Sequence, residues 1–264
     1  CDDARGMAAC LNELAAAATW VGNFADATTL SQQAIRFAER AHDETTIATA
    51  LAQAVTSGAD YEDVAERARR ALLHLRRVGN LDQQARVCVN AGYAAIVERR
   101  YRDALAWLDD GLDPARRLDD AAWQFTLLGN LGLATLFIDE FDEARRQFSA
   151  ALAICREAGC EDIVDETLLG LAAVEASCGR FPRAARLTGA AKRHEVPRGV
   201  AEDAVWSRLT EEILAPAREH DGHERWDSAE REGAELTVRD ALDLALRRGR
   251  FAPATDATMT AARS

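Results

Sequence analysis

Two histidines and three acidic residues crowd one short segment, from Glu219 to Glu224. His220 and His223 lie three residues apart, and imidazole and carboxylate groups are zinc ligands in proteins. A structural zinc site requires four converging ligands, however, and no other histidine of the chain has a partner at ligand spacing. Gly222 interrupts the segment and is typical of the end of a helix. We therefore interpret the segment as a polar turn and expect no metal and no cofactor.

The cysteines do not predict a disulfide framework, because there are only six in 264 residues and none forms a Cys-x-x-Cys pair. Cys155 and Cys160 lie five residues apart around Gly159, and a redox role is one interpretation of that spacing. The other is ordinary packing, because a free cysteine behaves as a small buried apolar side chain. We favour packing for this pair and for Cys88.

Motifs that carry common enzyme chemistry are missing from the sequence. Lys192 is the only lysine, and no glycine-rich loop ends in Lys-Ser or Lys-Thr, so the segment cannot hold a P-loop. The Gly-x-Ser-x-Gly elbow of hydrolases and the His-Glu-x-x-His helix of zinc peptidases are absent as well. We expect no catalytic residues and no enzyme activity, and any ATPase must lie outside this segment.

Helices must position any binding residues, because the composition disfavours strands. Hydrophobic residues make up 48% of the chain and charged residues 29%, and there are only 5 prolines. The formal net charge of −12 opposes a nucleic-acid surface, which needs clustered Lys or Arg. There is no run of about 18 apolar residues and no basic leader before an apolar stretch, so we expect a cytoplasmic protein. Because the chain begins with Cys1, we expect a fragment of a longer one.

An internal repeat sets the architecture. An aromatic residue is followed three positions later by a small one at four places, and Tyr61 with Val64 is a fifth, weaker pair. The aromatics are 37, 40, 40 and 40 residues apart, and a further small residue lies nine positions before each. The repeat positions are Ala15, Phe24 and Ala27, then Ala52 and Tyr61, then Gly92, Tyr101 and Ala104, then Gly132, Phe141 and Ala144, and finally Ala172, Phe181 and Ala184.

This spacing predicts five helical hairpins. The small residue lets two antiparallel helices approach, and the aromatic at the start of the second helix fills the wedge between them. Because one hairpin cannot bury its own apolar face, the hairpins must stack on one another. The tryptophans, Trp20 among them, are expected to fill the core.

The strings from Asn90 to Ala104 and from Asn130 to Ala144 resemble tetratricopeptide repeats. That family usually has a period of about 34 residues. The extra residues here fall after the second helix, as from Leu112 to Asp120, and indicate longer helices or longer loops between repeats. The resemblance implies an all-α, right-handed solenoid of helical hairpins. We expect hairpins over residues 1–196, capping helices over 197–249 and a disordered tail over 250–264.

The C-terminal third resembles one kind of regulator. The segments from Pro182 to Ala191, from His223 to Asp227 and from Gly233 to Thr237 are similar to the end of the helical-repeat region in bacterial ATP-dependent transcriptional regulators. LuxR-type and antibiotic-regulatory-protein-like members belong to that group. In them a signal-transduction ATPase precedes the repeats and a DNA-binding domain lies at one end. The resemblance, clearest over residues 125–247, implies a regulatory module of such a protein.

Three polar residues are the candidate partner-binding site. Asn90 and Asn130 each lie eleven residues before a repeat aromatic. In tetratricopeptide domains this position often faces the concave groove and hydrogen-bonds to a bound peptide. Arg86, four residues before Asn90, shares that helical face. The alternative is that both asparagines are solvated on an exposed face. The other repeats carry Glu13, Ala50 and Gly170 at this position.

The leading functional hypothesis is a protein-interaction and sensor module that receives a protein, a peptide or a neighbouring domain on its concave face. We expect it to contact neither nucleic acid nor membrane directly. A second hypothesis is a small-molecule sensor with a pocket between helices. A stand-alone tetratricopeptide scaffold and an all-helical enzyme are further alternatives. The sequence identifies neither the partner nor the oligomeric state.

Overall fold

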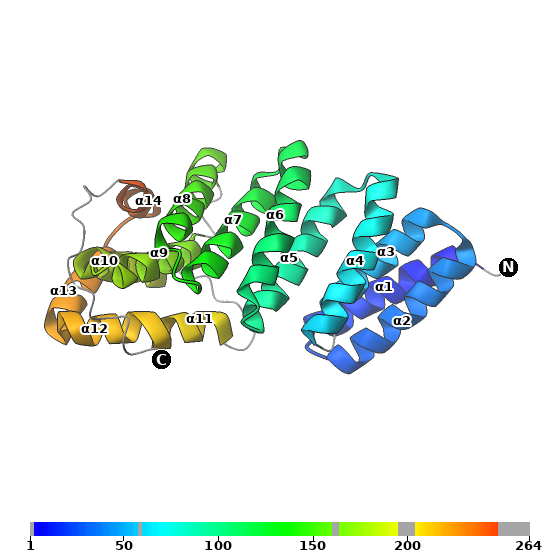
Figure 1. Cartoon of the computed structure of the whole chain (residues 1–264), viewed down its shortest axis with the longest axis horizontal. Coiled ribbons are helices and arrows are strands. Elements are labelled where there is room, and N and C mark those ends of the chain that lie inside the picture. The colour runs from blue at the N-terminus through cyan, green and yellow to red at the C-terminus, as the bar shows by residue number, and fades with distance from the viewer. Residues whose placement is uncertain (1–2, 58–59, 160–163, 195–203, 248–264) are drawn as a thin grey trace. The chain divides into compact units, whose positions relative to one another are not determined.

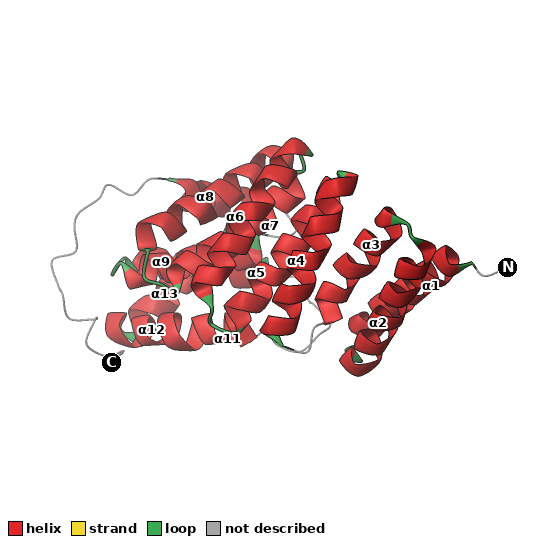
Figure 2. Cartoon of the chain, turned by 45° about the vertical axis from the view of Figure 1, so that its right-hand side comes forward, coloured by secondary structure: helices red, strands yellow, loops and turns green. Residues whose placement is uncertain are grey.

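The described part of the chain folds into helices joined by short connections. The computed structural model describes residues 3–57, 60–159, 164–194 and 204–247. Its regular elements over these ranges are helices, with no strand among them (Figure 2). The prediction of an all-α helical-repeat fold is therefore confirmed. The tail expected over residues 250–264 lies outside the described ranges.

The N-terminal compact unit, Cys1–Ile138, is a stack of helical hairpins. Its helices are α1 (Ala4–Trp20), α2 (Phe24–Ala41), α3 (Glu44–Ala54), α4 (Tyr61–Val78), α5 (Leu81–Val97), α6 (Tyr101–Arg117) and α7 (Ala121–Leu136), and a 3₁₀ turn covers Val55–Ser57. Helix α2 packs on α1, α4 on α3, and α6 on α5 (Figure 1). In addition, α3, α5 and α7 each contact the second helix of the hairpin before them.

The C-terminal compact unit, Asp139–Ser264, combines helices in repeat register with further helices of irregular length. Its helices are α8 (Phe141–Ala158), α9 (Asp165–Ser177), α10 (Phe181–Arg193), α11 (Ala204–Leu209), a π-helical turn η3 (Thr210–Leu214), α12 (Ala215–Asp221), α13 (His223–Ala234) and α14 (Val238–Leu246). Helix α9 packs on α8 and α10, and α10 also contacts α13 and α14. The segment from α11 to α12 is helical without a break.

The repeat aromatics mark the starts of helices. Phe24, Tyr61 and Tyr101 are the first residues of α2, α4 and α6, and Phe141 and Phe181 are the first residues of α8 and α10. In α2 and α4 the residue before the aromatic is an N-cap whose side-chain oxygen accepts an amide hydrogen bond. In α6, α8 and α10 no side-chain cap is present, so the backbone of the turn sets the start of the helix.

Four of the turns that precede these aromatics share one backbone conformation. The residue two positions before the aromatic is left-handed, with φ of 79° at Gly22, 58° at Arg99, 62° at Asp139 and 71° at Gly179. Glycine adopts this conformation without steric cost, whereas Arg99 and Asp139 hold it against their own Cβ atoms. The direction of the chain is therefore reset at the same residue of each of these turns.

Small residues of the repeat lie where helices approach closely. A Cβ atom on Gly92 in α5 would lie 2.6 Å from the Leu108 side chain of α6, so this crossing leaves little room for a side chain. In the C-terminal unit, a Cβ atom on Gly170, two residues before the repeat position Ala172, would overlap the ring of Phe148. The buried repeat positions are Ala15, Ala27, Ala52, Tyr61, Gly92, Ala104, Gly132, Ala144, Ala172 and Ala184, and the half-buried ones are Tyr101, Phe141 and Phe181.

The residues that lengthen the repeat are helical. Helix α6 continues through Pro114, although proline lacks the N–H that would complete the helical hydrogen-bond ladder, and it ends at Arg117. Helices α4 and α8 are 18 residues long and end at the left-handed glycines Gly79 and Gly159. After α4 and α6, where the connections to the next hairpin are short, long second helices therefore account for the extra residues of the repeat.

Candidate binding surface

The three predicted binding residues lie on first helices of hairpins in the N-terminal unit. Arg86 and Asn90 belong to α5 and Asn130 belongs to α7, and these two helices are in contact. All three side chains are half-buried. They thus lie on neighbouring helices and remain partly open to solvent, as contact with a ligand requires.

Arg86 is oriented by a residue that the sequence pattern did not single out. Its Nη1 donates a hydrogen bond to Oε1 of Gln53 in α3 at 3.3 Å. Arg86 lies 15 residues before Tyr101, and Gln53 lies eight residues before Tyr61. These two offsets differ by two helical turns and share one face of the first helix. The hydrogen bond therefore connects equivalent faces of α3 and α5. Counting positions back from the repeat aromatic would also have identified Gln53 from the sequence.

The two asparagine amides of this surface are left unpaired within the part of the chain that the structure describes. Neither the Asn90 nor the Asn130 side chain hydrogen-bonds to another described residue. Asn12 in α1, twelve residues before Phe24, is only 7% exposed, and its Oδ1 atom has no hydrogen-bond partner among the described residues. An amide both donates and accepts hydrogen bonds, so it can pair with the backbone of an extended peptide.

The polar row does not continue through every hairpin. The position eleven residues before the aromatic holds exposed Glu13 in α1 but buried Ala50 in α3. In the C-terminal unit the same position is Gly170, which is buried against Phe148. The polar row of the N-terminal unit therefore runs over α5 and α7, and Gln53 extends it onto α3.

Apolar side chains occupy another position on the same helical face. Trp20, Val97 and Phe137 each lie four residues before a repeat aromatic. Trp20 is 87% exposed and Val97 is 42% exposed, while the Phe137 ring stacks on Tyr101 with 5.3 Å between ring centroids. The expectation that the tryptophans fill the core is wrong for Trp20, because this last residue of α1 points into solvent. Trp226, at 1% exposure, does lie in the core.

The other chemical candidates lie in the C-terminal unit. His220 and His223 flank the end of α12, and the His220 ring packs on Phe181 with 5.1 Å between ring centroids. Among the described residues, no group of three or more His, Cys, Asp or Glu side chains could hold a metal ion. Cys155 is fully buried in α8, whereas Cys160 lies outside the described ranges.

A shallow hollow of about 600 Å³ lies between α4 and α6 and opens widely to solvent. The Arg69 guanidinium lies over the Trp107 ring, 6.0 Å from its centroid. Trp107 donates from Nε1 to the Tyr61 hydroxyl at 3.1 Å, and burial raises the pKa of that hydroxyl. The hollow is lined by Arg69, Leu72, Leu73, Arg76, Arg77, Trp107 and Asp110.

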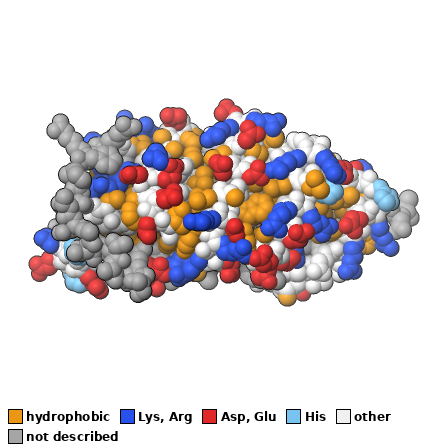
Figure 3. Space-filling view, viewed as in Figure 1, with side chains coloured by type: hydrophobic (Ala, Val, Ile, Leu, Met, Phe, Trp, Pro, Cys, Tyr) orange, Lys and Arg blue, Asp and Glu red, His pale blue; other side chains and the backbone are white. Residues whose placement is uncertain are grey.

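Charges of both signs are mixed on one face of the described part of the chain. Acidic and basic side chains alternate with apolar bands on the face shown in Figure 3. Several pairs join neighbouring hairpins, such as Arg5 of α1 and Asp43, whose closest atoms are 3.0 Å apart. In the described ranges, no helix combines the length and the apolar character that crossing a bilayer would need.

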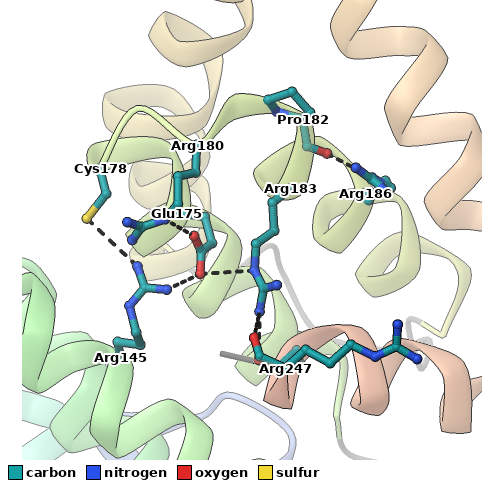
Figure 4. A network of polar contacts seen from close by, with 9 residues as sticks. Arg145, Glu175, Cys178, Arg180, Pro182, Arg183, Arg186 and Arg247 are labelled. Atoms are coloured by element: carbon teal, nitrogen blue, oxygen red, sulfur yellow. Dashed lines mark hydrogen bonds and ion pairs between the residues drawn. The ribbon is translucent and has the colours of Figure 1, made fainter. Parts of the chain in front are cut away.

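The C-terminal unit contains a buried carboxylate that joins four helices (Figure 4). The Glu175 side chain of α9 is 0% exposed and forms ion pairs with Arg145 of α8, Arg180 before α10 and Arg183 of α10. The Arg183 Nε lies 3.2 Å from Glu175 Oε1. The Arg183 Nη2 also donates to two carbonyl oxygens at the end of α14, at 3.0 and 2.9 Å. This cluster therefore holds α14 against the repeat helices.

Residues 7–45 match the tetratricopeptide repeat family. The match covers α1, α2 and the start of α3, so it falls on an earlier hairpin than the strings from Asn90 and Asn130 that resemble this family. Among the curated proteins, none matches the sequence.

Several solved structures share the fold. BtubC (BKLC) from P. vanneervenii is 22% identical with a TM-score of 0.62, over 76% of this chain and 87% of that chain. A STAND protein with a tetratricopeptide repeat sensor from Pyrococcus horikoshii is 12% identical with a TM-score of 0.65, over 91% of this chain and 38% of that chain. A Rap protein complexed with Competence and Sporulation Factor is 18% identical with a TM-score of 0.57, over 89% and 73%. At these identities, the likeness shows a tetratricopeptide-like fold and no shared activity.

Proposed function

We propose that this chain is the interaction and sensor module of a multidomain bacterial transcriptional regulator in the cytoplasm. Its partner, a protein, a peptide or a neighbouring domain, binds to the surface formed by α3, α5 and α7. The observation that carries the proposal is the pair of half-buried amides, Asn90 and Asn130, which hydrogen-bond to no other described residue. Arg86, oriented by Gln53, adds a cation that can pair with a carboxylate of the partner.

The known structures support the class of function. Tetratricopeptide-like repeats are typical of protein-interaction modules. The repeats of the Pyrococcus STAND protein are described as a sensor, and the Rap protein is complexed with Competence and Sporulation Factor. The regulator context depends on the similarity of residues 125–247 to bacterial ATP-dependent transcriptional regulators. An interaction surface without a catalytic role agrees with the likeness to these structures and with the similarity to the regulators.

Alanine substitution of both amides tests the surface. The wild-type chain and the Asn90→Ala/Asn130→Ala variant are immobilised, and the proteins that each retains from an extract of the source organism are identified by mass spectrometry. We expect the variant to lose the partners, because each lost hydrogen bond weakens binding by about 1 kcal/mol, or roughly thirtyfold in affinity for the pair. Its melting temperature should stay close to wild type, because neither amide bonds to another described residue.

Two exposed amides on α2 provide a matched control, because Gln32 and Gln33 lie on the second helix of a hairpin. The Gln32→Ala/Gln33→Ala variant should retain the same partners as the wild-type chain. Equal retention by all three chains would contradict the placement of the site. If no protein is retained but a metabolite raises the melting temperature, the small-molecule sensor becomes the better hypothesis.

A further inference from the structure

Helix α4 carries a leucine at a position where the neighbouring second helices are charged. Leu73 is 52% exposed and lies twelve residues after Tyr61. At the equivalent position α2 has Arg36 and α6 has Asp113, and both are exposed. Hairpins pack before and after the α3–α4 hairpin, so Leu73 stays open to solvent with both neighbours in place. Packing of the described hairpins therefore does not account for a leucine at this position.

Two arginines flank Leu73 on the same face of α4. Arg69 lies four residues before it and Arg77 four residues after it, and positions four apart share one helical face. All three line the shallow hollow of about 600 Å³ between α4 and α6, together with Trp107 of α6. The lining holds three arginines and a single carboxylate, that of Asp110, although the chain has a net charge of −12. The hollow is thus lined mainly by cations around an apolar centre.

The two flanking guanidinium groups are held only weakly by the rest of the chain. The acidic lining residue Asp110 is already bound through both oxygens by the third arginine. Arg69 lies 3.5 Å from Glu66, and its side chain is 59% exposed. Arg77 lies 3.5 Å from Glu44, and its side chain is 60% exposed. Such long, solvated ion pairs contribute little stability, so a carboxylate of a ligand can replace them at little cost.

The spacing of these side chains defines the ligand. Eight residues separate Arg69 from Arg77, which is about 12 Å along the axis of α4. In an extended peptide, four residues span about 13 Å and alternate side chains point to one side. Acidic side chains at the first and fifth positions would reach the two arginines, and an apolar side chain at the third would lie on Leu73 and Trp107. A compact small molecule fits less well, because a wide, shallow hollow cannot enclose most of its surface.

We propose that the hollow between α4 and α6 is a second docking site, which binds an extended segment of a partner protein with the pattern acid-x-apolar-x-acid. Charge complementarity favours this occupant, because the two arginines attract both carboxylates while Leu73 and Trp107 cover the side chain between them. Arg69 is already directed to the site, since its guanidinium lies over the Trp107 ring, 6.0 Å from the centroid. The site lies on second helices and does not depend on the proposed surface of α3, α5 and α7.

Fluorescence anisotropy with a labelled, end-capped peptide, Ser-Glu-Ser-Leu-Ser-Glu-Ser, tests the site on the whole 264-residue chain. We expect saturable binding that weakens as salt is added. Arg69→Ala/Arg77→Ala should weaken binding roughly tenfold, because two exposed ion pairs to the peptide are lost. Replacing both glutamates of the peptide by glutamine, or its leucine by serine, should weaken binding to the wild-type chain as well.

Arg70→Ala/Arg117→Ala is the matched control, because it removes the same charge from two arginines that do not line the hollow. Arg70 lies on α4 next to Arg69 and is 49% exposed. Arg117 lies on α6 and is 61% exposed. This variant should bind the peptide as the wild-type chain does. The Asn90→Ala/Asn130→Ala variant should do so too, because the amides lie on first helices.

Three results would overturn the proposal: no saturable binding by the wild-type chain, equal weakening in the two arginine double variants, or equally strong binding of a peptide whose glutamates are side by side. Loss of binding in the amide variant would also overturn it, because the peptide would then lie on the first helices. Both arginine variants alter exposed side chains, so circular dichroism should show them folded. The partners that the amide surface retains from an extract are measured separately, so the two proposals can fail independently.

Discussion

Arg76 of α4 and Asp110 of α6 form an ion pair between consecutive hairpins, in which Nη2 lies 2.7 and 2.5 Å from the two carboxylate oxygens. One hairpin earlier, the equivalent pair has the opposite polarity, because Glu39 of α2 lies 3.7 Å from Arg70 of α4. Each pair joins the residue 15 positions after one repeat aromatic to the residue nine positions after the next. In the N-terminal unit, two equivalent contacts between hairpins are thus ion pairs in which the acidic and basic residues are exchanged.

Exchanging the charges of Arg76 and Asp110 should preserve their ion pair. Asp110→Arg alone sets two guanidinium groups against each other, and Arg76→Asp alone sets two carboxylates together. Both side chains are about half exposed (55% and 43%). We therefore expect each single change to cost only about 0.5–1 kcal/mol of unfolding free energy, and the double change to recover most of it. Urea unfolding of the four proteins gives the coupling energy, which should shrink at high salt. Additive single effects would show that the two side chains do not interact.

Helices α10 and α13 cross through two glycines. A Cβ atom on Gly189 would overlap the carbonyl oxygen of Glu230, and one on Gly233 would overlap the carbonyl oxygen of Arg186. Because backbone atoms cannot rotate away, we expect Gly189→Ala to lower the unfolding free energy by about 2 kcal/mol or more. Gly92→Ala is the comparison, since its Cβ atom would meet the Leu108 side chain, which can move. Thermal unfolding should show the larger loss for Gly189→Ala, and equal losses would contradict a backbone-to-backbone crossing.

Removing the charge of Glu175 should destabilise the C-terminal unit. Glu175→Gln leaves Arg145, Arg180 and Arg183, whose side chains are 22%, 32% and 18% exposed, without their buried counter-charge. Breaking a buried pair in this way costs on the order of 3 kcal/mol. Because Arg183 also holds the end of α14, hydrogen exchange should accelerate in α14 before it does in α9.

A carboxylate of α8 that is partly open to solvent, with 30% of its side chain exposed, is the control for this change. Glu143 pairs with Arg146, whose side chain is 66% exposed. Glu143→Gln should therefore change the unfolding free energy by less than about 1 kcal/mol and leave α14 exchange unaltered. If Glu175→Gln behaves in the same way, the cluster does not position α14.

The Cys88 thiol should resist ionisation in the folded chain. Burial, assisted by the negative charge of Asp110, raises its pKa from the ordinary 9.0 to about 12. Above pH 9 the unfolded thiol loses its proton while the folded one keeps it, so this contribution to stability is complete below pH 9 and is lost as the pH rises toward 12. At pH 8, iodoacetamide should modify exposed Cys10 rapidly and Cys88 only after unfolding. The stability difference between wild type and Cys88→Ala should fall between pH 8 and pH 10.5. A constant difference would contradict the raised pKa.

The register of the hairpins was predictable because packing restricts residue types locally. An aromatic such as Tyr101 lies where the second helix begins, and a small residue lies at the position of Gly92, where Leu108 crosses. Both positions lie within one hairpin, so they recur at a fixed period in the sequence. The same register places Asn90 and Asn130 on adjacent first helices, although their role as binding residues stays a prediction.

Features that join distant segments were not predictable. Nothing in the sequence distinguishes Glu175 from a glutamate in solvent. Only the fold brings three arginines to its carboxylate. Gly189 and Gly233 do not share a repeat register, so no periodicity connects them. Trp20 and Trp226 are alike as residues, yet one is 87% and the other 1% exposed. Their difference depends on which helices cover them.

The reversed ion pairs also favour one order of the hairpins over others. The α3–α4 hairpin presents Arg70 to the hairpin before it and Arg76 to the hairpin after it. A tandem copy of this hairpin would therefore set Arg76 of the first copy against Arg70 of the second. An α5–α6 hairpin in tandem would instead set Arg116 against Asp110, which attract. Duplication is thus electrostatically permitted for one hairpin and opposed for its neighbour, so charge at this contact limits how such an array can lengthen.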